Sequence, residues 1–188
     1  MKKLFTRLLA CLLMAAMLLP TAALADNMFD VPSFGDIFTP ANGVQSFTPS
    51  VPTVKWTHAS GIISFDIPTE WTETNSGDLF PTFFAADGLG NLTITATDAE
   101  GTNFFANFAT VKDIFTKQYN DQGIIVTAFE LTQYGGRQAI RIDVMNQGYQ
   151  QTQILIQPSD YTALLFFTFT ASATIHTDLV MNSVWLDD

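Results

Sequence analysis

Apolar and polar residues alternate in several short runs after residue 60, which is the pattern of half-buried strands. Such runs cover residues 63–67 and 92–97, the latter with threonines on one face, and a further strand is predicted over residues 80–85. Between residues 103 and 120 the apolar positions instead recur every three or four residues, which predicts an amphipathic helix. This part of the chain is therefore expected to form strands followed by one helix.

Four further strands and a second helix are expected in the rest of the chain. The strands are predicted over residues 124–131, 138–145, 149–157 and 161–170. The helix is predicted over residues 172–185, with Ile175 in its buried stripe. Consecutive strands joined by short turns pair antiparallel. The pattern therefore predicts the α+β class, an antiparallel sheet with helices packed on it.

The N-terminus has the order of features found in secretory signal peptides. Three basic residues lie among the first seven positions, residues 8–19 are apolar, and Ala23 and Ala25 give a small-x-small cleavage site. The apolar run is shorter than the roughly 20 residues that span a bilayer. We therefore predict that residues 1–25 are a signal peptide, that no integral membrane span remains after cleavage, and that the protein is secreted or extracytoplasmic. Lipidation at Cys11, which ends a short lipoprotein-like box, is the alternative.

Prolines interrupt the segment that follows, residues 26–55, and prevent a continuous helix or strand ladder. We predict a flexible linker here, followed by one domain over residues 56–188, which is long enough to bury a core of its own. The linker also contains spaced apolar residues, among them Phe29, Phe38 and Phe47. Two interpretations of these residues stay open: the segment lies on its own domain, or it docks on a partner.

Three stretches of the predicted domain resemble PsbP-like domains. Residues 61–71, which read Gly-Ile-Ile-Ser-Phe-Asp-Ile-Pro-Thr-Glu-Trp, are similar to the opening strand and Pro-x-x-Trp turn of that family. Residues 134–139 resemble the entry to its central strands, and residues 161–185 resemble its closing strand and terminal helix. The resemblance covers about residues 56–188.

This resemblance implies an α/β/α sandwich around an antiparallel sheet. The family includes the extrinsic photosystem subunit, Mog-type Ran-binding proteins and small exported bacterial proteins of the DcrB type, which are mainly binding or assembly proteins. The resemblance therefore implies a non-enzymatic binding or assembly module of the cell envelope or the extracellular space. Because a fold alone does not assign a function, a hydrolase with an unrecognised carboxylate site stays open as the alternative.

The charge of the chain argues against nucleic acid as a partner. The sequence has 8 lysines and arginines against 18 aspartates and glutamates, a net charge of −10. The predicted cleavage removes three of the cations and none of the acids, so the exported protein is more acidic still. Proteins bind polyanions through cationic side chains that release counterions. The expected partner is therefore a protein or a small ligand of unknown identity.

No catalytic, cofactor or metal site is predicted. Cys11 is the single cysteine and lies in the predicted signal peptide, so the exported chain has no thiolate nucleophile or cysteine ligand. His58 and His176 lie far apart in the sequence, without the spacing of a metal or triad motif. Asp87 and Asp98 flank a predicted strand and could offer oxygens to a calcium ion, but solvated turn acids are the favoured interpretation.

A recognition surface is predicted where polar and basic residues lie on neighbouring strands. Gln151 and Gln153 alternate with other positions of one strand, which indicates a solvated face of the sheet. Arg141 lies on the preceding predicted strand and Arg137 directly before it, and Trp71 has an aromatic ring that can stack on a ligand. We expect these five residues to mark the binding surface.

Overall fold

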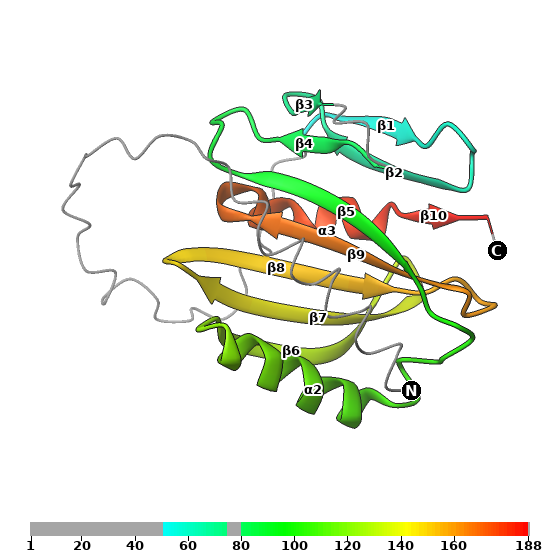
Figure 1. The fold of residues 1–188 in the computed structure, drawn as a ribbon. Helices are drawn as coiled ribbons and strands as arrows, with labels where there is room; N and C mark the ends of the chain where they lie inside the picture. The colour runs from blue at the N-terminus through cyan, green and yellow to red at the C-terminus, as the bar shows by residue number, and fades with distance from the viewer. Residues whose placement is uncertain (1–50, 75–79, 188) are drawn as a thin grey trace, which may run out of the picture.

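Two antiparallel sheets and three helical segments make up the part of the chain that the computed structural model describes, residues 51–74 and 80–187 (Figure 1). The predicted signal peptide, residues 1–25, lies outside these residues. So does most of the predicted linker, residues 26–50. Among the described residues, none of the helices has the length and the apolar character needed to cross a membrane.

The larger sheet has seven strands in the spatial order β3-β4-β5-β9-β8-β7-β6. Its strands are β3 (Thr72–Thr74), β4 (Thr82–Phe84), β5 (Asn91–Asp98), β6 (Ile125–Tyr134), β7 (Arg137–Asn146), β8 (Tyr149–Ile156) and β9 (Ala163–Thr170). Every neighbouring pair is antiparallel, which confirms the predicted α+β class. The long strands β6 to β9 lie close to their predicted positions because turn residues, glycines before and after β7 and Pro158 after β8, mark their ends.

The smaller sheet consists of β1 (Thr53–Thr57), β2 (Ile63–Pro68) and β10 (Trp185–Leu186), with β2 in the middle. β1 pairs with β2 from Thr53 to Thr57, and the N–H of Thr69 donates to the carbonyl of Pro52 at 2.9 Å. The prediction that the linker extends to residue 55 is therefore wrong, since the ladder begins at Thr53. The side chains of this edge strand are mostly exposed, so its sequence has no alternation of apolar residues from which the strand could be predicted.

Helix α2 (Phe108–Asp121) packs its buried residues Val111, Phe115 and Tyr119 on one face of the large sheet. It begins later than residue 103, where the sequence placed its start, because the chain first makes a turn. The Asn103 side chain accepts from the N–H of Ala106 at 2.9 Å, as a cap would, while the N–H of Phe104 donates to the Gln157 side chain at 2.9 Å.

The C-terminal segment is not the single helix predicted over residues 172–185. It forms a 3₁₀ helix, η1 (Ala171–His176), a short helix, α3 (Thr177–Asn182), and then β10. The hydroxyls of Thr174 and Thr177 each donate at 2.8 Å to a carbonyl three residues earlier, which favours the tighter turns. Ile175, predicted to be buried, is 78% exposed.

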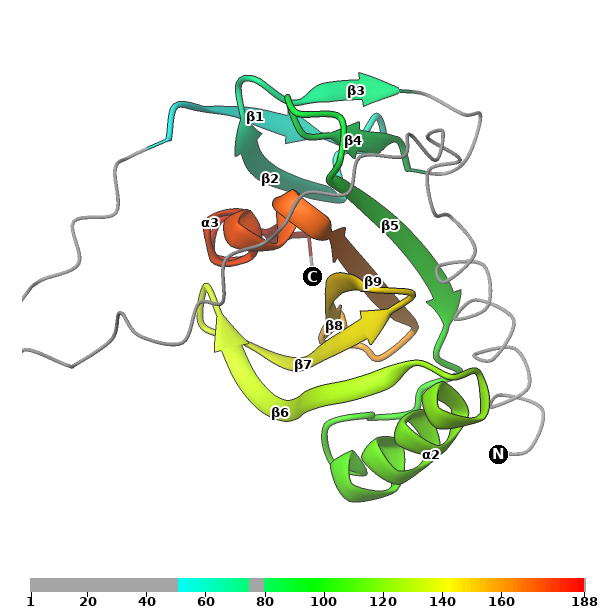
Figure 2. The ribbon, with the colours of Figure 1, turned by 90° about the vertical axis from the view of Figure 1, so that its left-hand side faces the viewer.

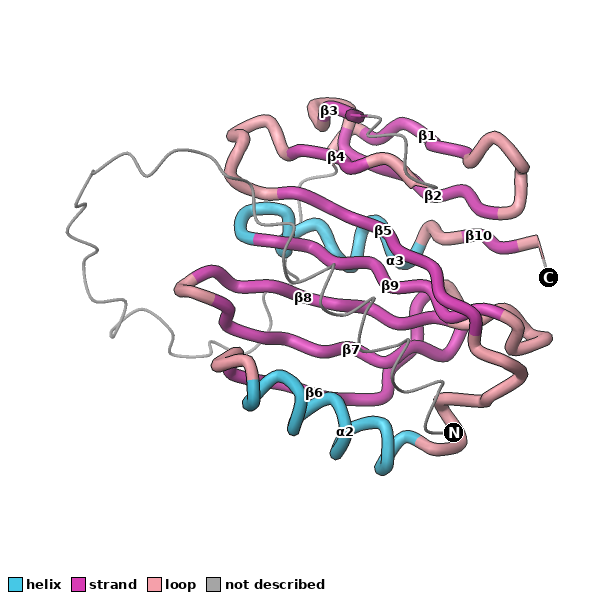
Figure 3. Tube along the Cα trace, in the orientation of Figure 1, coloured by secondary structure: helices cyan, strands magenta, loops and turns pink. Residues whose placement is uncertain are grey.

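The two faces of the large sheet carry separate apolar cores. Figure 2 shows the sheet curving around α3, with α2 on the outer side, and Figure 3 shows α2 running along β6. The inner core contains Phe65, Phe83 and Phe167 in edge-to-face contacts. The outer core contains Phe115 stacked on Phe166 at 6.3 Å between ring centroids. Helices on both faces give the layered arrangement that the resemblance implied.

Candidate functional site

A hollow of about 210 Å³ lies where three segments meet at one end of the inner face. The turn after β2, the turn between β4 and β5, and η1 each form one wall. We call this hollow the Trp71 pocket. Its lining residues are Glu70, Trp71, Ala85, Ala86, Asp87, Ser172, Ile175 and His176.

The turn after β2 fixes one wall of the pocket. The N–H of Trp71 donates to the carbonyl of Pro68 at 3.1 Å, so the chain turns directly after the strand and the indole folds inward. The Trp71 ring meets the His176 ring edge to face, with 5.6 Å between the centroids. Its indole N–H is buried, and it has no hydrogen-bond partner in the described part of the chain. Such a donor is costly to leave unpaired and marks this corner as unusual.

The turn between β4 and β5 supplies the acidic side of the pocket. Asp87 accepts through one carboxylate oxygen from the N–H of Leu89 at 2.9 Å and from the N–H of Gly90 at 3.3 Å. The neighbouring Ser172 side chain, and then these N–H groups, hold the pKa of Asp87 below its ordinary value. Asp87 is therefore ionised at neutral pH.

Close packing joins that turn to η1. A Cβ atom at Gly90 would lie 2.4 Å from the backbone nitrogen of Ala173, a distance that no side chain tolerates. At the start of η1, Ala171 has φ 46°, in the left-handed region that favours glycine. The tight turn out of β9 thus brings Ser172, Ile175 and His176 to the pocket.

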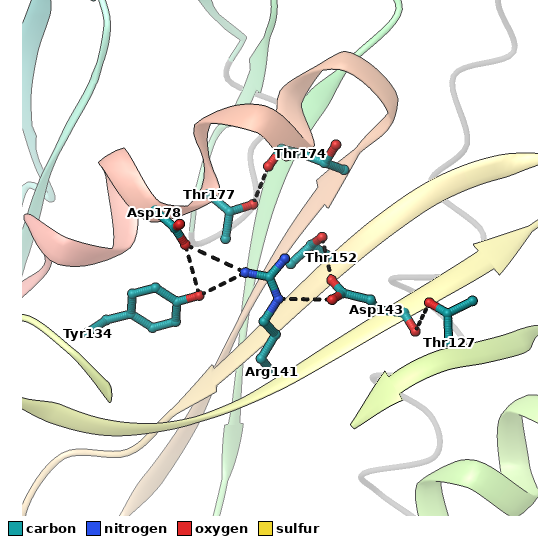
Figure 4. Close-up of polar contacts among 8 residues, drawn as sticks. All are labelled: Thr127, Tyr134, Arg141, Asp143, Thr152, Thr174, Thr177 and Asp178. Carbon is teal, nitrogen blue, oxygen red and sulfur yellow. Dashed lines mark hydrogen bonds and ion pairs between the residues drawn. The ribbon is translucent and has the colours of Figure 1, made fainter. Parts of the chain in front are cut away.

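Arg141, one of the predicted recognition residues, is held by neighbours on the inner face (Figure 4). Its guanidinium donates to Asp143 at 2.9 Å and to the Tyr134 hydroxyl at 3.3 Å, and lies 3.6 Å from Asp178 of α3. Asp143 also accepts from the Thr152 hydroxyl at 2.7 Å. We call these residues the Arg141 cluster. The guanidinium of Arg141 already contacts Asp143, Tyr134 and Asp178. The cluster therefore stabilises the contact between β7 and α3, and few N–H groups of Arg141 are available to a ligand.

The prediction of a solvated glutamine face is wrong. Gln151 and Gln153 are only 1% and 2% exposed, and the Tyr119 hydroxyl of α2 donates to Gln153. Trp71 is 7% exposed and lies in the pocket wall. Arg137 begins β7 and is half-buried.

The five predicted residues do not form one surface, because alternation identifies the two faces of a strand but not which face is covered. Gln153 lies on the face that α2 covers, and Arg141 on the face that α3 covers. Burial also raises the pKa of Tyr119 and Tyr134, which keeps both phenols neutral beside these contacts. Sequence reasoning missed Glu70, Ser172 and Ile175 as pocket residues, since no spacing links residues so far apart.

The acids considered for calcium sit in separate turns. Asp98 accepts from the N–H of Glu100 at 2.8 Å, as Asp87 does from its own turn. The described residues contain no group of three or more histidines, cysteines, aspartates or glutamates placed to hold a metal ion. His58 and His176 lie apart, in contact with Phe80 and Trp71 respectively.

Comparison with known proteins gives a likeness of fold. No family model and no curated protein matches the sequence. The solution structure of cyanobacterial PsbP from Synechocystis sp. PCC 6803 matches 77% of this chain and 98% of its own, with 12% identity and a TM-score of 0.54.

Two further solved structures are similar. A crystal structure from Bacteroides thetaiotaomicron matches 71% of this chain at 16% identity and a TM-score of 0.50, and the chain spans 48% of that protein. The Ran-binding protein Mog1p of Saccharomyces cerevisiae matches 65% of this chain and 78% of its own, at 9% identity and a TM-score of 0.45. The PsbP match confirms the PsbP-like fold predicted from the sequence; at such identities it shows the fold alone.

Proposed function

We propose that this protein is an extracytoplasmic binding or assembly module without catalytic activity, and that it takes its ligand at the Trp71 pocket. The observation that carries the proposal is the pocket itself: a concave site with an aromatic wall and a few polar groups. Concave, mostly apolar sites of this kind are where proteins bind small groups. In the Arg141 cluster, by contrast, the guanidinium already contacts two carboxylates, those of Asp143 and Asp178.

The chemistry of the walls indicates the kind of ligand. Trp71, Ala85, Ala86 and Ile175 offer apolar surface, whereas Glu70 and Asp87 offer negative charge. The described residues place no lysine or arginine in the lining. A binding site favours ligands of opposite charge and disfavours ligands of like charge. The ligand is therefore an apolar group next to a positive charge, from a small amine or from a basic segment of a protein.

The N-terminal sequence supports a location outside the cytoplasm. Its basic start, short apolar run and Ala23–Ala25 cleavage site are those of an exported protein. An intact mass that corresponds to a start at Asp26 is the expected finding for the exported protein. A mass that includes residues 1–25 would contradict export by cleavage.

The direction of the pKa shift at two carboxyl groups, Asp87 and Asp160, favours a binding role for these groups over that of a general acid. A general acid needs a carboxyl whose pKa is raised toward neutrality. The pKa of Asp87 is lowered, first by Ser172, and that of Asp160 is lowered by the N–H and hydroxyl of Thr162. These groups are acceptors of hydrogen bonds and carriers of charge, which suits binding better than proton transfer.

Titration with phenethylammonium, followed by NMR, tests the pocket. We expect the indole N–H signal of Trp71 to shift and saturate, and 2-phenylethanol, which lacks the charge, to bind more weakly. Asp87→Asn keeps the acceptor oxygen of the turn but removes the charge, so it should weaken amine binding about two- to fivefold. Asp98→Asn, in a similar turn outside the pocket lining, is the matched control. No shift at Trp71, or equal effects of the two variants, would contradict the proposal.

A further inference from the structure

We infer that the free edge of β6 pairs with the same edge of a second copy of the chain, which gives a symmetric dimer with one continuous sheet. The inference goes beyond the proposed function, because it concerns another part of the fold. β6 lies at one end of the order of the seven strands, whereas the Trp71 pocket includes the turn between β4 and β5, toward the other end.

β6 is a long edge strand without the usual protection against pairing. It has ten residues, whereas the other edge strands β1, β3 and β10 have five, three and two. Natural edge strands are commonly short, interrupted by proline or lined with lysine. β6 contains neither proline nor lysine, and its register shift lies early, between Val126 and Ala128. The regular part that follows can therefore pair with a further strand.

The turn between β6 and β7 determines which backbone groups of β6 are directed away from β7. The turn consists of the two glycines 135 and 136, both with positive φ, as a type I′ hairpin requires. In such a hairpin the flanking residues, here Tyr134 and Arg137, form a hydrogen-bonded pair. Hydrogen-bonded and non-hydrogen-bonded pairs alternate along the ladder. Every second residue before Tyr134 therefore bonds to β7, and the residues between them direct their backbone groups outward.

The outward groups are the N–H and C=O of Phe129, Leu131 and Gln133. The ammonium of Lys112 donates to the carbonyl of Phe129 at 3.4 Å, as expected if that carbonyl faces away from β7. No described strand lies on this side of β6. These groups are therefore placed to accept a strand of matching length.

A pairing centred on Leu131 uses all of these groups. A two-fold axis places Leu131 opposite its counterpart, and each then donates its N–H to the other's carbonyl. Leu131 pairs with Ile140 of the outer core within the sheet, so its side chain lies on the outer face. It is 44% exposed in the single chain. The dimer brings the two leucine side chains into contact and covers them.

The charge along the strand favours the same arrangement. Glu130 is the one charged residue in the sequence of β6. With Leu131 on the axis, Glu130 lies opposite Thr132 of the second copy, whereas an axis at Glu130 would place two carboxylates opposite each other, which is destabilising. The chain as a whole carries a net charge of −10. Two acidic copies can thus approach along β6 with little repulsion, which favours a second copy as the occupant of this edge.

Helix α2 leaves space for the second copy. Its first residue, Phe108, contacts Phe129 with 5.8 Å between the ring centroids, and its last residue, Asp121, is followed closely by the start of β6 at Ile125. The helix therefore lies beside the first part of β6, and the part that leads to the turn extends past it (Figure 2). In the dimer the two α2 helices then lie on opposite sides of the axis.

Self-crosslinking of a single cysteine tests the pairing. Cys11 is the single native cysteine and lies in the predicted signal peptide, so exported Leu131→Cys has one thiol. Hydrogen-bonded antiparallel partners have Cα atoms about 5.5 Å apart, within the range of a disulfide. The control, Ile125→Cys, is at a 64% exposed position of the same strand, and its two copies would lie roughly 40 Å apart.

We expect mild oxidation to link Leu131→Cys into covalent dimers about tenfold faster than Ile125→Cys. Equal rates would indicate random collision and would overturn the inference.

Sedimentation equilibrium of the exported protein tests the dimer without a crosslink. We expect a species of twice the chain mass. Leu131→Lys, which would place two ammonium groups opposite each other, should weaken dimerisation about tenfold or more, whereas Ile125→Lys should not. A dimer as stable in Leu131→Lys as in wild type would overturn the inference. So would a wild type that stays monomeric up to about 1 mM, which would leave this edge to a strand of another protein.

Amine binding separates this inference from the proposed function. Leu131→Lys should bind phenethylammonium as wild type does, because the Trp71 pocket lies away from β6. If the amine binds but no dimer forms, the dimer is wrong and the proposed function stands. If the dimer forms but the amine does not bind, the dimer stands and the proposed function falls.

Discussion

Ala171 shows how a single backbone conformation supports the pocket. Its φ of 46° directs the chain from β9 into η1, which carries Ser172, Ile175 and His176 to their places in the wall. A left-handed conformation costs a residue with a Cβ about 1–2 kcal/mol relative to glycine. The fold retains this strained turn although a glycine would relieve it, which is common at functional sites.

Ala171→Gly should therefore stabilise the protein. Relief of the strain exceeds the entropy that glycine gains in the unfolded chain, so we expect the free energy of unfolding to rise by about 0.5–1 kcal/mol. Urea denaturation measures it. Ala173→Gly, at a buried position of the same helix without a positive φ, should instead lower stability by about 1 kcal/mol. Destabilisation by both changes would show that Ala171 is not strained.

Asp87 makes the stability of the pocket depend on pH. The folded state lowers the pKa of this carboxyl, chiefly through Ser172 and the N–H of Leu89, so the ionised form stabilises the fold. That contribution is fully present above the ordinary pKa and is lost as the pH falls through the lowered one. We expect wild type to be more stable than Asp87→Asn at pH 7 and the difference to vanish well below pH 4. A difference as large at pH 2 as at pH 7 would contradict this.

At the scale of elements, the contact between the β4–β5 turn and η1 is the junction that forms the pocket. Gly90 permits it, because any Cβ there would meet the backbone of Ala173 and the carbonyl of Thr170. The neighbouring Gly88 has open space around it and a φ of 68°. The two glycines thus serve different needs, one steric and the other conformational.

Gly90→Ala should lower the free energy of unfolding by about 2–3 kcal/mol and perturb the pocket, since backbone atoms must move apart. Gly88→Ala is the control, with an expected cost of about 1 kcal/mol from its left-handed conformation alone. Thermal or urea unfolding, together with the NMR signal of the Trp71 indole, distinguishes them. An equal loss of stability and an unmoved indole signal in both variants would show that the turn does not pack tightly on η1.

The sequence predicted strands better than it predicted the ends of the helices and the site. β5 and β7 show clear alternation of apolar and polar residues in the sequence, so their positions could be predicted directly. The bounds of the C-terminal helix could not be predicted in this way. The hydroxyls of Thr174 and Thr177 donate to backbone carbonyls and tighten η1, which the spacing of apolar residues does not indicate.

The pocket was missed for a similar reason, since it depends on contacts between distant segments. The sequence pattern indicated Trp71 as a possible stacking residue and gave no site role to His176, yet their rings meet in one wall. The only signal in the sequence that could have suggested the pocket was the Pro-x-x-Trp turn that ends at Trp71. The burial of Gln151 and Gln153 could not be predicted either, because no local pattern shows which sheet face is covered.

At the scale of the whole molecule, the structural polar contacts and the proposed binding site occupy different parts of the same sheet face. The Arg141 cluster joins β7 to α3 within the inner face, whereas the Trp71 pocket lies where β2, the β4–β5 turn and η1 meet. The chain carries a net charge of −10, which favours solubility and disfavours polyanions. A cationic ligand at an acidic pocket agrees with both features.

Capture from an extract of the source cell's envelope tests the central claim, that the Trp71 pocket is the binding site. The exported protein, its Ile175→Lys variant and its Leu131→Lys variant are immobilised side by side. Both substituted side chains are exposed, at 78% and 44%, so neither change should disturb the fold. The account predicts that wild type and Leu131→Lys retain the same partner and that Ile175→Lys, which places a positive charge at the pocket, loses it. Equal retention by all three proteins would contradict the claim.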